Sequence, residues 1–313
     1  MSRLGTTLLT ALAPAIWGST YLVTSELLPP GQPLFAGLVR ALPAGLIALA
    51  LTRTLPRGAW WGKAALLGTL NIGAFFPLLF LSAYRLPGGI AATLGAVQPL
   101  VVALIAVPLL GERVSTRKIL WGLVGVAGVS LVVLRSTAQL DALGIVAGIA
   151  GPLGMAVGTV LTKRWGRPAG VGATAFAGWQ LTAGGLVLLP LTLFIEGVPA
   201  SIDGGALAGY LWLALAGGLV SYALWFDGIG KIPVTSAALL GLVSPLVAAT
   251  LGALVLGQWL GPWQLAGFAL ALAAIVGGQL PGRRTAPDRI GRGQLTAARA
   301  EPELRPSGRS ASR

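Results

Sequence analysis

Two prolines, each following a polar residue, interrupt long apolar stretches at matched places in the chain. Gln98 precedes Pro99 and Ser244 precedes Pro245, and the two pairs are 146 residues apart. A proline inside a helix removes a backbone hydrogen bond and leaves a carbonyl group free, and the polar side chain beside it can add a hydrogen bond. We therefore predict that both pairs line a binding site for a small molecule. A helix kink that only shapes packing is the alternative.

Aromatic and amide side chains gather in three other apolar stretches. A pocket that is mostly apolar, with a few polar groups, suits an amphipathic solute, and packing of a protein core is the alternative use of the same residues. We expect these side chains to join Gln98 and Ser244 in binding a substrate. They are Trp17, Tyr21, Asn71, Phe75, Phe76, Tyr222 and Trp225.

Two charged residues are candidates for gating or structural roles, together with Pro99 and Pro245. Arg40 is the only charge in the middle of an apolar stretch. Placing it in hydrocarbon costs at least about 2.5–3.5 kcal/mol, so it must face protein or water. It could hold an anionic group of a substrate, or tie helices together through backbone carbonyls, which is the role we predict. Glu112, beside Arg113, is expected to form an ion pair at a helix end rather than to carry protons.

Composition excludes several kinds of chemistry. The chain contains no Cys and no His, so disulfides, Cys/His metal sites and nucleophile–histidine pairs are impossible. The segment from Gly58 to Lys63 lacks the spacing of a phosphate-binding loop, and Ala64 follows the lysine where Ser or Thr is needed. We therefore expect no enzyme activity, no metal and no cofactor, with a membrane enzyme or a non-transporting scaffold as the alternative class.

The chain is too apolar for a soluble protein. It is 55% hydrophobic and 10% charged, with a mean hydropathy of +0.82, whereas a soluble domain carries about 25% charged residues. A helix needs roughly 20 mostly apolar residues to cross a bilayer. The sequence therefore predicts an all-α membrane protein with ten transmembrane helices. Their approximate ranges are 5–24, 31–51, 62–83, 88–110, 116–134, 141–161, 170–190, 205–226, 233–256 and 262–280.

An internal repeat organises these helices. Residues 85–113 and 231–259 share one pattern without a gap, so that Pro87 corresponds to Pro233. A repeat of this kind dictates the architecture, and each copy holds five predicted helices. Because five is odd, the second copy crosses the membrane in the opposite sense, which is typical of alternating-access transporters. The two predicted inverted repeats span residues 1–135 and 136–280.

Matches between the copies extend beyond this segment. Residues 36–46 align with residues 176–186 at an offset of 140, which pairs Arg40 with Gln180. At the offset of 146, Phe75 corresponds to Ser221. The two halves therefore also share sequence in the helices that precede the first match.

Charge sets the predicted orientation. With the N-terminus inside, the inner loops and termini hold nineteen Lys and Arg residues and the outer loops hold two. Cytoplasmic loops carry such an excess, so both termini are predicted in the cytoplasm of a cell that holds the chain in its plasma or inner membrane. Residues 281–313 read as a disordered basic tail that could touch anionic lipid. The net charge of +13 therefore does not indicate a nucleic-acid partner.

Four motifs make the sequence similar to a known family. They are Trp17–Tyr21, Phe35–Arg40, the Leu-Pro-x-x-x-Ala-x-x-Leu-x-x-x-x-Pro-Leu pattern of Leu86–Leu100, and Leu110–Arg113. Over about residues 1–280 the chain resembles the EamA module, a tandem ten-helix carrier of the drug/metabolite transporter superfamily. The resemblance implies that the first, third, fourth, sixth, eighth and ninth helices surround the cavity. The second copy departs from the family at Gln258, where Glu is usual, so a role for that carboxylate cannot be symmetric.

The resemblance and the repeat together predict a secondary transporter that works by alternating access. The run Ala13–Tyr21 resembles the branch of exporters of pigment (indigoidine-type) and amino-acid-like metabolites, so export of small amphipathic metabolites is expected. An importer or exchanger of another metabolite class is the alternative among carriers. The predicted partners are a small-molecule substrate and the lipid bilayer, and the protein is expected to be a monomer or homodimer.

Overall fold

The computed structural model describes residues 2–86, 91, 94–95, 98–111, 116–133, 141–257 and 261–279. Every regular element in these ranges is a helix, which confirms the all-α membrane class. Residues 1–280 form one compact unit that contains both predicted repeats. Residues 281–313, the predicted basic tail, form the other unit and lie outside the described residues, as do Glu112 and Gln258.

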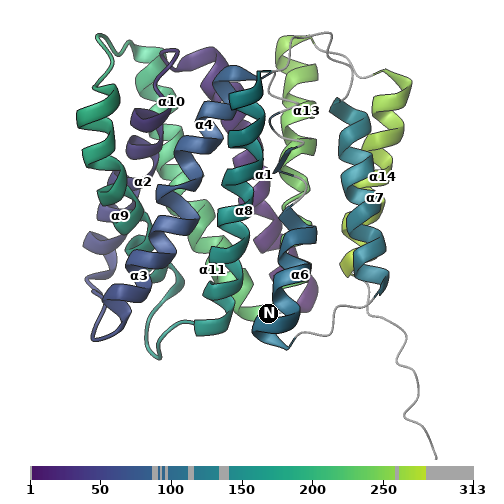
Figure 1. Cartoon of the computed structure of the whole chain (residues 1–313), viewed down its shortest axis with the longest axis horizontal. Helices are drawn as coiled ribbons and strands as arrows, with labels where there is room; N and C mark the ends of the chain where they lie inside the picture. The colour runs from purple at the N-terminus through teal and green to yellow at the C-terminus, as the bar shows by residue number, and fades with distance from the viewer. Residues whose placement is uncertain are drawn as a thin grey trace, which may run out of the picture. The chain divides into compact units, whose positions relative to one another are not determined.

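The helices lie in all ten of the predicted ranges, and several of those ranges contain more than one helical element (Figure 1). Two π-helical segments, η1 and η3, divide their ranges, and a third, η2, continues α9. The elements are α1 (Arg3–Leu27), α2 (Pro33–Thr52), α3 (Trp60–Gly68), η1 (Thr69–Gly73), α4 (Phe75–Arg85), α6 (Gln98–Leu110), α7 (Thr116–Val133), α8 (Ala142–Trp165), α9 (Ala173–Leu191), η2 (Thr192–Glu196), α10 (Gly204–Ala214), η3 (Leu215–Val220), α11 (Ser221–Lys231), α12 (Val234–Leu240), α13 (Val243–Leu256) and α14 (Pro262–Gln279).

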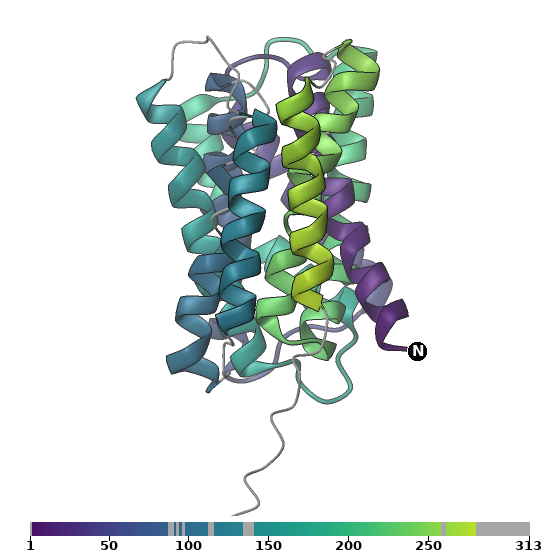
Figure 2. The same ribbon diagram turned by 90° about the vertical axis from the view of Figure 1, so that its right-hand side faces the viewer.

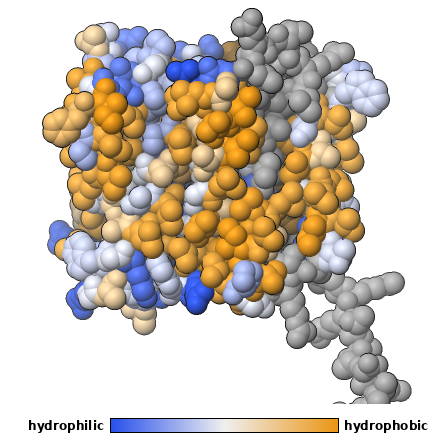
Figure 3. All heavy atoms as spheres, in the orientation of Figure 1, coloured by the Kyte–Doolittle hydropathy of each residue, from blue (hydrophilic) through white to orange (hydrophobic). Residues whose placement is uncertain are grey.

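Six helical stretches in the described ranges are long and apolar enough to cross a membrane, and two shorter apolar helices accompany them. The six stretches are Pro33–Thr52, Trp60–Arg85, Ala142–Trp165, Ala173–Glu196, Gly204–Lys231 and Val234–Leu256. The surface agrees with this assignment, because Phe194, Leu104 and Trp263 are each at least 70% exposed. On the face shown in Figure 3, hydrophobic residues form a broad band with hydrophilic residues at its upper and lower edges. An apolar surface of this extent is typical of a lipid-facing protein.

Helices from the two predicted repeats pack in pairs. At one end of the unit α2 lies along α9, and at the other end α7 lies along α14 (Figures 1 and 2). Between them α1 contacts α11 and α13, while α8 contacts α4 and α6. This set of pairs is symmetric. If each of the first five predicted helices is replaced by its counterpart among the second five, and the reverse, the same pairs result.

Glycines allow the close approach of α2 and α9. A Cβ atom on Gly185 would lie 2.7 Å from Cβ of Leu42, and a Cβ on Gly45 would clash with the backbone nitrogen of Thr182. Gly45 and Gly185 are 140 residues apart and correspond in the repeat. Small residues let membrane helices pack backbone against backbone. Both copies therefore place a glycine at the same position of this interface.

Gly185→Ala is expected to destabilise the protein by about 1–3 kcal/mol, because the added methyl group overpacks the contact with Leu42. Gly62→Ala is the matched control, since it also lies in a helix and a Cβ there would meet nothing within 4 Å. Thermal unfolding in detergent is the measurement. Equal melting temperatures for the two variants would contradict the tight packing of α2 on α9.

Two of the π-helical segments lie at corresponding places. η1 joins α3 to α4 and η3 joins α10 to α11, and their first residues, Thr69 and Leu215, are 146 residues apart. π-helical turns are rare and occur frequently at functional sites. Both segments lie deep in their apolar helices, where they alter which backbone carbonyls are available to neighbouring side chains.

Candidate functional site

A cavity of about 80 Å³ lies among helices of both predicted repeats. Its walls come from α1, α2, α4, α6, α8, α11 and α13, with residues 91 and 95, which are helical and precede α6, and residue 241 between α12 and α13. Four aromatic side chains and four buried or half-buried polar ones contribute to the lining. The lining residues are Trp17, Tyr21, Arg40, Phe75, Leu79, Ser82, Ala91, Gly95, Gln98, Gly148, Pro152, Met155, Trp225, Gly241, Ser244 and Pro245.

Six of the nine residues predicted to bind substrate lie on this cavity, and so do two of those predicted to have structural roles. The six are Trp17, Tyr21, Phe75, Gln98, Trp225 and Ser244, and the two are Arg40 and Pro245. The two polar–proline pairs therefore approach one space from α6 and α13. Pro99 is buried next to Gln98 without lining the cavity.

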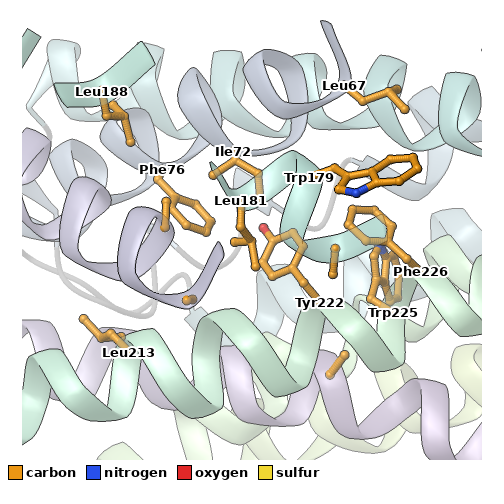
Figure 4. Close-up of a cluster of buried hydrophobic side chains, with 14 of the residues drawn as sticks. Leu67, Ile72, Phe76, Trp179, Leu181, Leu188, Leu213, Tyr222, Trp225 and Phe226 are labelled. Carbon is orange, nitrogen blue, oxygen red and sulfur yellow. The ribbon is translucent and has the colours of Figure 1, made fainter. Parts of the chain in front are cut away.

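The other three predicted binding residues are buried behind the cavity wall. The Tyr222 ring lies 5.0 Å from the Trp17 ring and 5.8 Å from the Phe76 ring, measured between centroids. Figure 4 shows Phe76, Tyr222, Trp225 and Phe226 in the same cluster of buried side chains. Asn71 is also fully buried and does not reach the cavity. These residues support the wall, and their contact with a solute stays a prediction.

One backbone carbonyl in η3 organises the wall. The oxygen of Gly217 accepts hydrogen bonds from Trp17 Nε1 at 3.1 Å, from an Arg40 terminal nitrogen at 3.1 Å and from Ser221 Oγ at 2.6 Å. Trp17 Nε1 also donates to Ser221 Oγ at 2.8 Å. The π-helical turn thus fixes an aromatic side chain of α1 and the charged side chain of α2 on the same atom.

Arg40 is buried, with 1% of its surface exposed. Its second terminal nitrogen donates to Thr20 Oγ1 at 3.3 Å, and its guanidinium carbon lies 4.5 Å above the Phe76 ring centroid, a favourable cation–π geometry. Arg40 therefore touches a backbone carbonyl, as the helix-tying role requires, and also lines the cavity, as the anion-binding role requires. The geometry is compatible with both roles.

The contact between Arg40 and Gly217 has a counterpart at corresponding positions of the repeat. Asn71 Nδ2 donates to Gln180 Oε1 at 2.8 Å and to Thr162 Oγ1 at 3.3 Å. Gln180 aligns with Arg40 at the offset of 140, and Asn71 aligns with Gly217 at the offset of 146. Each contact joins the second helix of one predicted repeat to a π-helical segment of the other.

Three residues that organise these contacts were not predicted from the sequence to be functional, namely Gln180, Ser221 and Gly217. The signal that could have found Gln180 is its alignment with Arg40, because a polar residue at the place of a buried arginine needs an explanation. Ser221 was visible as the counterpart of Phe75. Nothing in the sequence marks the carbonyl of Gly217, since its role depends on a π-helical turn.

Charged residues outside the cavity form hydrogen bonds with backbone groups at the ends of helices. The Glu196 carboxylate accepts from the backbone nitrogens of Leu34 and Phe35, at 2.9 and 2.6 Å, where α2 begins. Lys163 Nζ donates to the carbonyl oxygens of Ile229 and Ile232, at 2.8 and 2.9 Å, where α11 ends. Each charge has the sign that complements the helix dipole. These contacts tie neighbouring helices together at the two rims of the unit.

Asp141 caps α8 just before its apolar segment begins. Its carboxylate accepts from the backbone nitrogen of Gly144 at 2.7 Å and from Arg85 at 3.0 Å. The Gly144 hydrogen bond, followed by the interaction with Arg85, lowers the pKa of Asp141 below its usual value. A carboxyl group with a lowered pKa stabilises the folded state above its unfolded pKa and loses that contribution as the pH falls through its folded pKa.

Asp141→Asn is therefore expected to lower the melting temperature slightly at pH 7, because it keeps the cap acceptor and removes the charge. The difference from the original protein should shrink as the pH falls below about 4, the usual pKa of an aspartate, because the unfolded chain then takes up a proton before the folded protein does. Thermal unfolding across pH 3 to 7 is the measurement. A difference that stays constant down to pH 3 would show that the charge of Asp141 contributes nothing.

Comparison with known proteins identifies the family. The EamA-like transporter family matches residues 5–134 and 142–277 of the chain. Protein PecM of Dickeya dadantii (strain 3937) is 45% identical over 264 residues, which cover 84% of this chain and 89% of PecM. "Uncharacterized inner membrane transporter YedA" of Escherichia coli (strain K12) is 28% identical over 272 residues, covering 83% of this chain and 86% of YedA. A solved crystal structure superimposes with a TM-score of 0.70 at 23% identity, covering 88% of this chain and 96% of the other, and this likeness shows the fold alone.

Two family matches that together cover most of the chain, a relative at 45% identity and apolar helices long enough to span a bilayer all agree. The chain belongs to the EamA-like transporter family and is a multi-pass membrane transporter.

Proposed function

We propose that this transporter is a secondary carrier that exports small amphipathic metabolites by alternating access. The observation that carries the proposal is the cavity between the two predicted repeats, where aromatic rings and the side chains of Gln98 and Ser244 meet. Amino-acid-like or pigment-like solutes fit such a lining, since it offers apolar surface with a few hydrogen-bonding groups. The name of the family and the name of the relative YedA, both of which say transporter, weigh against a membrane enzyme.

We propose further that ten helices form two inverted repeats, residues 1–135 and 136–280, with both termini in the cytoplasm. The unchanged set of helix pairs, the glycine pair at the α2–α9 contact and the matched η1 and η3 segments support this arrangement. The excess of Lys and Arg in one set of loops supports the orientation. The site would then lie at the interface of the repeats, as it does in carriers of this design.

The cavity is narrow in this structure. Its volume of about 80 Å³ is small beside the roughly 300–1,000 Å³ of typical ligand sites. A metabolite can therefore occupy it only when the surrounding helices move apart. We propose that the repeats rock about η1 and η3, whose contacts with Gln180 and Arg40 join the two halves. The mechanism requires these polar contacts to persist or re-form as the cavity opens to each side in turn.

Flux in proteoliposomes tests the proposed function. The purified protein is expected to give saturable movement of radiolabelled tryptophan, taken as an amphipathic amino acid, above the flux of empty liposomes. The same assay with an imposed pH gradient separates proton coupling from facilitated diffusion. A flux that never exceeds that of empty liposomes, for tryptophan and for a panel of pigment-like solutes, would contradict the proposal.

A further inference from the structure

The cavity carries a positive charge that no acid in the described part of the chain balances. Arg40 is the one charged residue among those found on its wall. The undescribed positions between residues 87 and 97 include no Asp or Glu in the sequence. Of the acids that the structure describes, Asp227 pairs with Arg167 and Lys231, Asp141 pairs with Arg85, and Glu196 binds backbone nitrogens. Asp203 caps α10 and Glu26 is exposed, so none of them neutralises Arg40.

The same wall holds buried hydrogen-bonding atoms that have no partner among the residues that the structure describes. They are Arg40 Nε, Trp225 Nε1 and Ser82 Oγ. The first two can only donate hydrogen bonds, and each side chain is at least 98% buried. Leaving a buried donor without an acceptor costs about 1–3 kcal/mol, and more where the group is charged. A ligand that supplies acceptor oxygens would remove this cost at two places in one cavity.

We infer that the transported solute carries a carboxylate, which Arg40 Nε and Trp225 Nε1 bind inside the cavity. This inference rests on the proposed transport function and names the substrate class for the same site. A carboxylate offers two oxygens to two donors and neutralises the guanidinium. The other lining rings, from Trp17, Tyr21 and Phe75, suit an apolar or aromatic group attached to the carboxylate. The substrate class is therefore a small organic acid with a hydrophobic body.

The contacts already made by Arg40 are consistent with this role. Its two terminal nitrogens hold Thr20 Oγ1 and Gly217 O, so the guanidinium keeps a fixed position without a ligand. The Phe76 ring on one face restricts it further. A side chain fixed in advance loses little conformational entropy on binding. The helix-tying contacts thus occupy both terminal nitrogens of Arg40, so Nε is the nitrogen of this cavity-lining guanidinium without a partner among the described residues.

Binding of benzoate and benzamide to the purified full-length protein tests the inference. The two compounds have the same ring and nearly the same shape, and they differ in charge. Radiolabelled benzoate should bind saturably, and unlabelled benzamide should compete at least tenfold more weakly than unlabelled benzoate at constant sodium chloride concentration. Equal competition by the two compounds, or no saturable benzoate binding, would overturn the inference.

Variants locate the anion site. Trp225→Phe keeps an aromatic ring and removes the Nε1 donor, so it should weaken benzoate binding about tenfold and benzamide binding less, because a bond to a charged acceptor is stronger than one to an amide oxygen. Arg40→Gln should abolish the preference for benzoate, and Trp225→Phe keeps the test decisive if the Arg40 variant does not fold. Trp263→Phe is the control, because Trp263 is 70% exposed on α14. Unchanged benzoate binding by Trp225→Phe would overturn the assignment.

The outcomes also separate this inference from the proposed function. Preferential binding of benzoate without flux of any solute would contradict the proposed transport function and would still support the anion site. Saturable flux of solutes by a protein that binds benzamide and benzoate equally tightly would support the proposed transport function and overturn the anion site.

Discussion

Replacing Trp17 by phenylalanine is expected to lower the initial rate of solute flux about tenfold or more while the protein still folds and inserts. The change removes the Nε1 donor that holds Gly217 O at 3.1 Å and Ser221 Oγ at 2.8 Å. Each hydrogen bond is worth about 0.5–1.5 kcal/mol, and about 1.4 kcal/mol corresponds to a factor of ten in rate. The flux of radiolabelled tryptophan into proteoliposomes with matched protein content is the measurement.

Trp263→Phe is the matched control for this experiment, because it makes the same substitution on the exposed surface of α14. Folding of the Trp17 variant should survive, since Gly217 O keeps its bonds from Arg40 and Ser221. If Trp17→Phe and Trp263→Phe both transport at the rate of the original protein, the indole contact between α1 and η3 has no part in transport.

Gln180→Leu is expected to destabilise the protein by about 1–3 kcal/mol. The Asn71 amide loses its 2.8 Å acceptor and keeps only Thr162 Oγ1, while its own oxygen already has no partner among the described residues. Leaving a buried amide incompletely bonded costs about this much, whereas replacing both partners by apolar groups can be nearly neutral. Thermal unfolding in detergent is the measurement, and the flux of the same variant reports whether the contact also matters for transport.

A double-mutant cycle isolates the contact. Asn71→Leu, Gln180→Leu and the combined variant should show that the pair loses less stability than the sum of the two single changes. Independent sites add within about 0.3–0.5 kcal/mol. Additivity within that limit would mean that Asn71 and Gln180 do not stabilise each other. The counterpart of the Arg40–Gly217 contact would then contribute nothing to stability.

The helices of this protein are predictable because length and apolarity suffice to define a membrane-spanning segment. The π-helical turns are different. Thr69–Gly73 and Leu215–Val220 contain neither Pro nor a polar signature that separates them from α-helix. Close packing against neighbouring helices accompanies both turns, as where a Cβ on Gly218 would lie 2.6 Å from the Arg40 carbonyl oxygen. Such contacts form only in the folded chain, so the repeat could predict that the turns correspond but not that they are π-helical.

The sequence allowed us to predict which helices contribute to the candidate site, but only some of the residues that line it. Trp17, Gln98 and Ser244 lie on the cavity, whereas Phe76 and Tyr222 lie behind it on the same helices as Phe75 and Trp225. A helix that is apolar all round carries no periodic signal for the direction of each face. The choice between cavity and core therefore depends on helix rotation, which tertiary packing decides.

Sidedness of two corresponding positions tests the central claim, the inversion of the repeats, most directly. The chain has no Cys, so single cysteines at positions 112 and 258 can be labelled without background. We predict that a membrane-impermeant maleimide reaches Gln258→Cys from outside intact cells and reaches Glu112→Cys only after the membrane is opened. Reaction of both cysteines from the same side would contradict it.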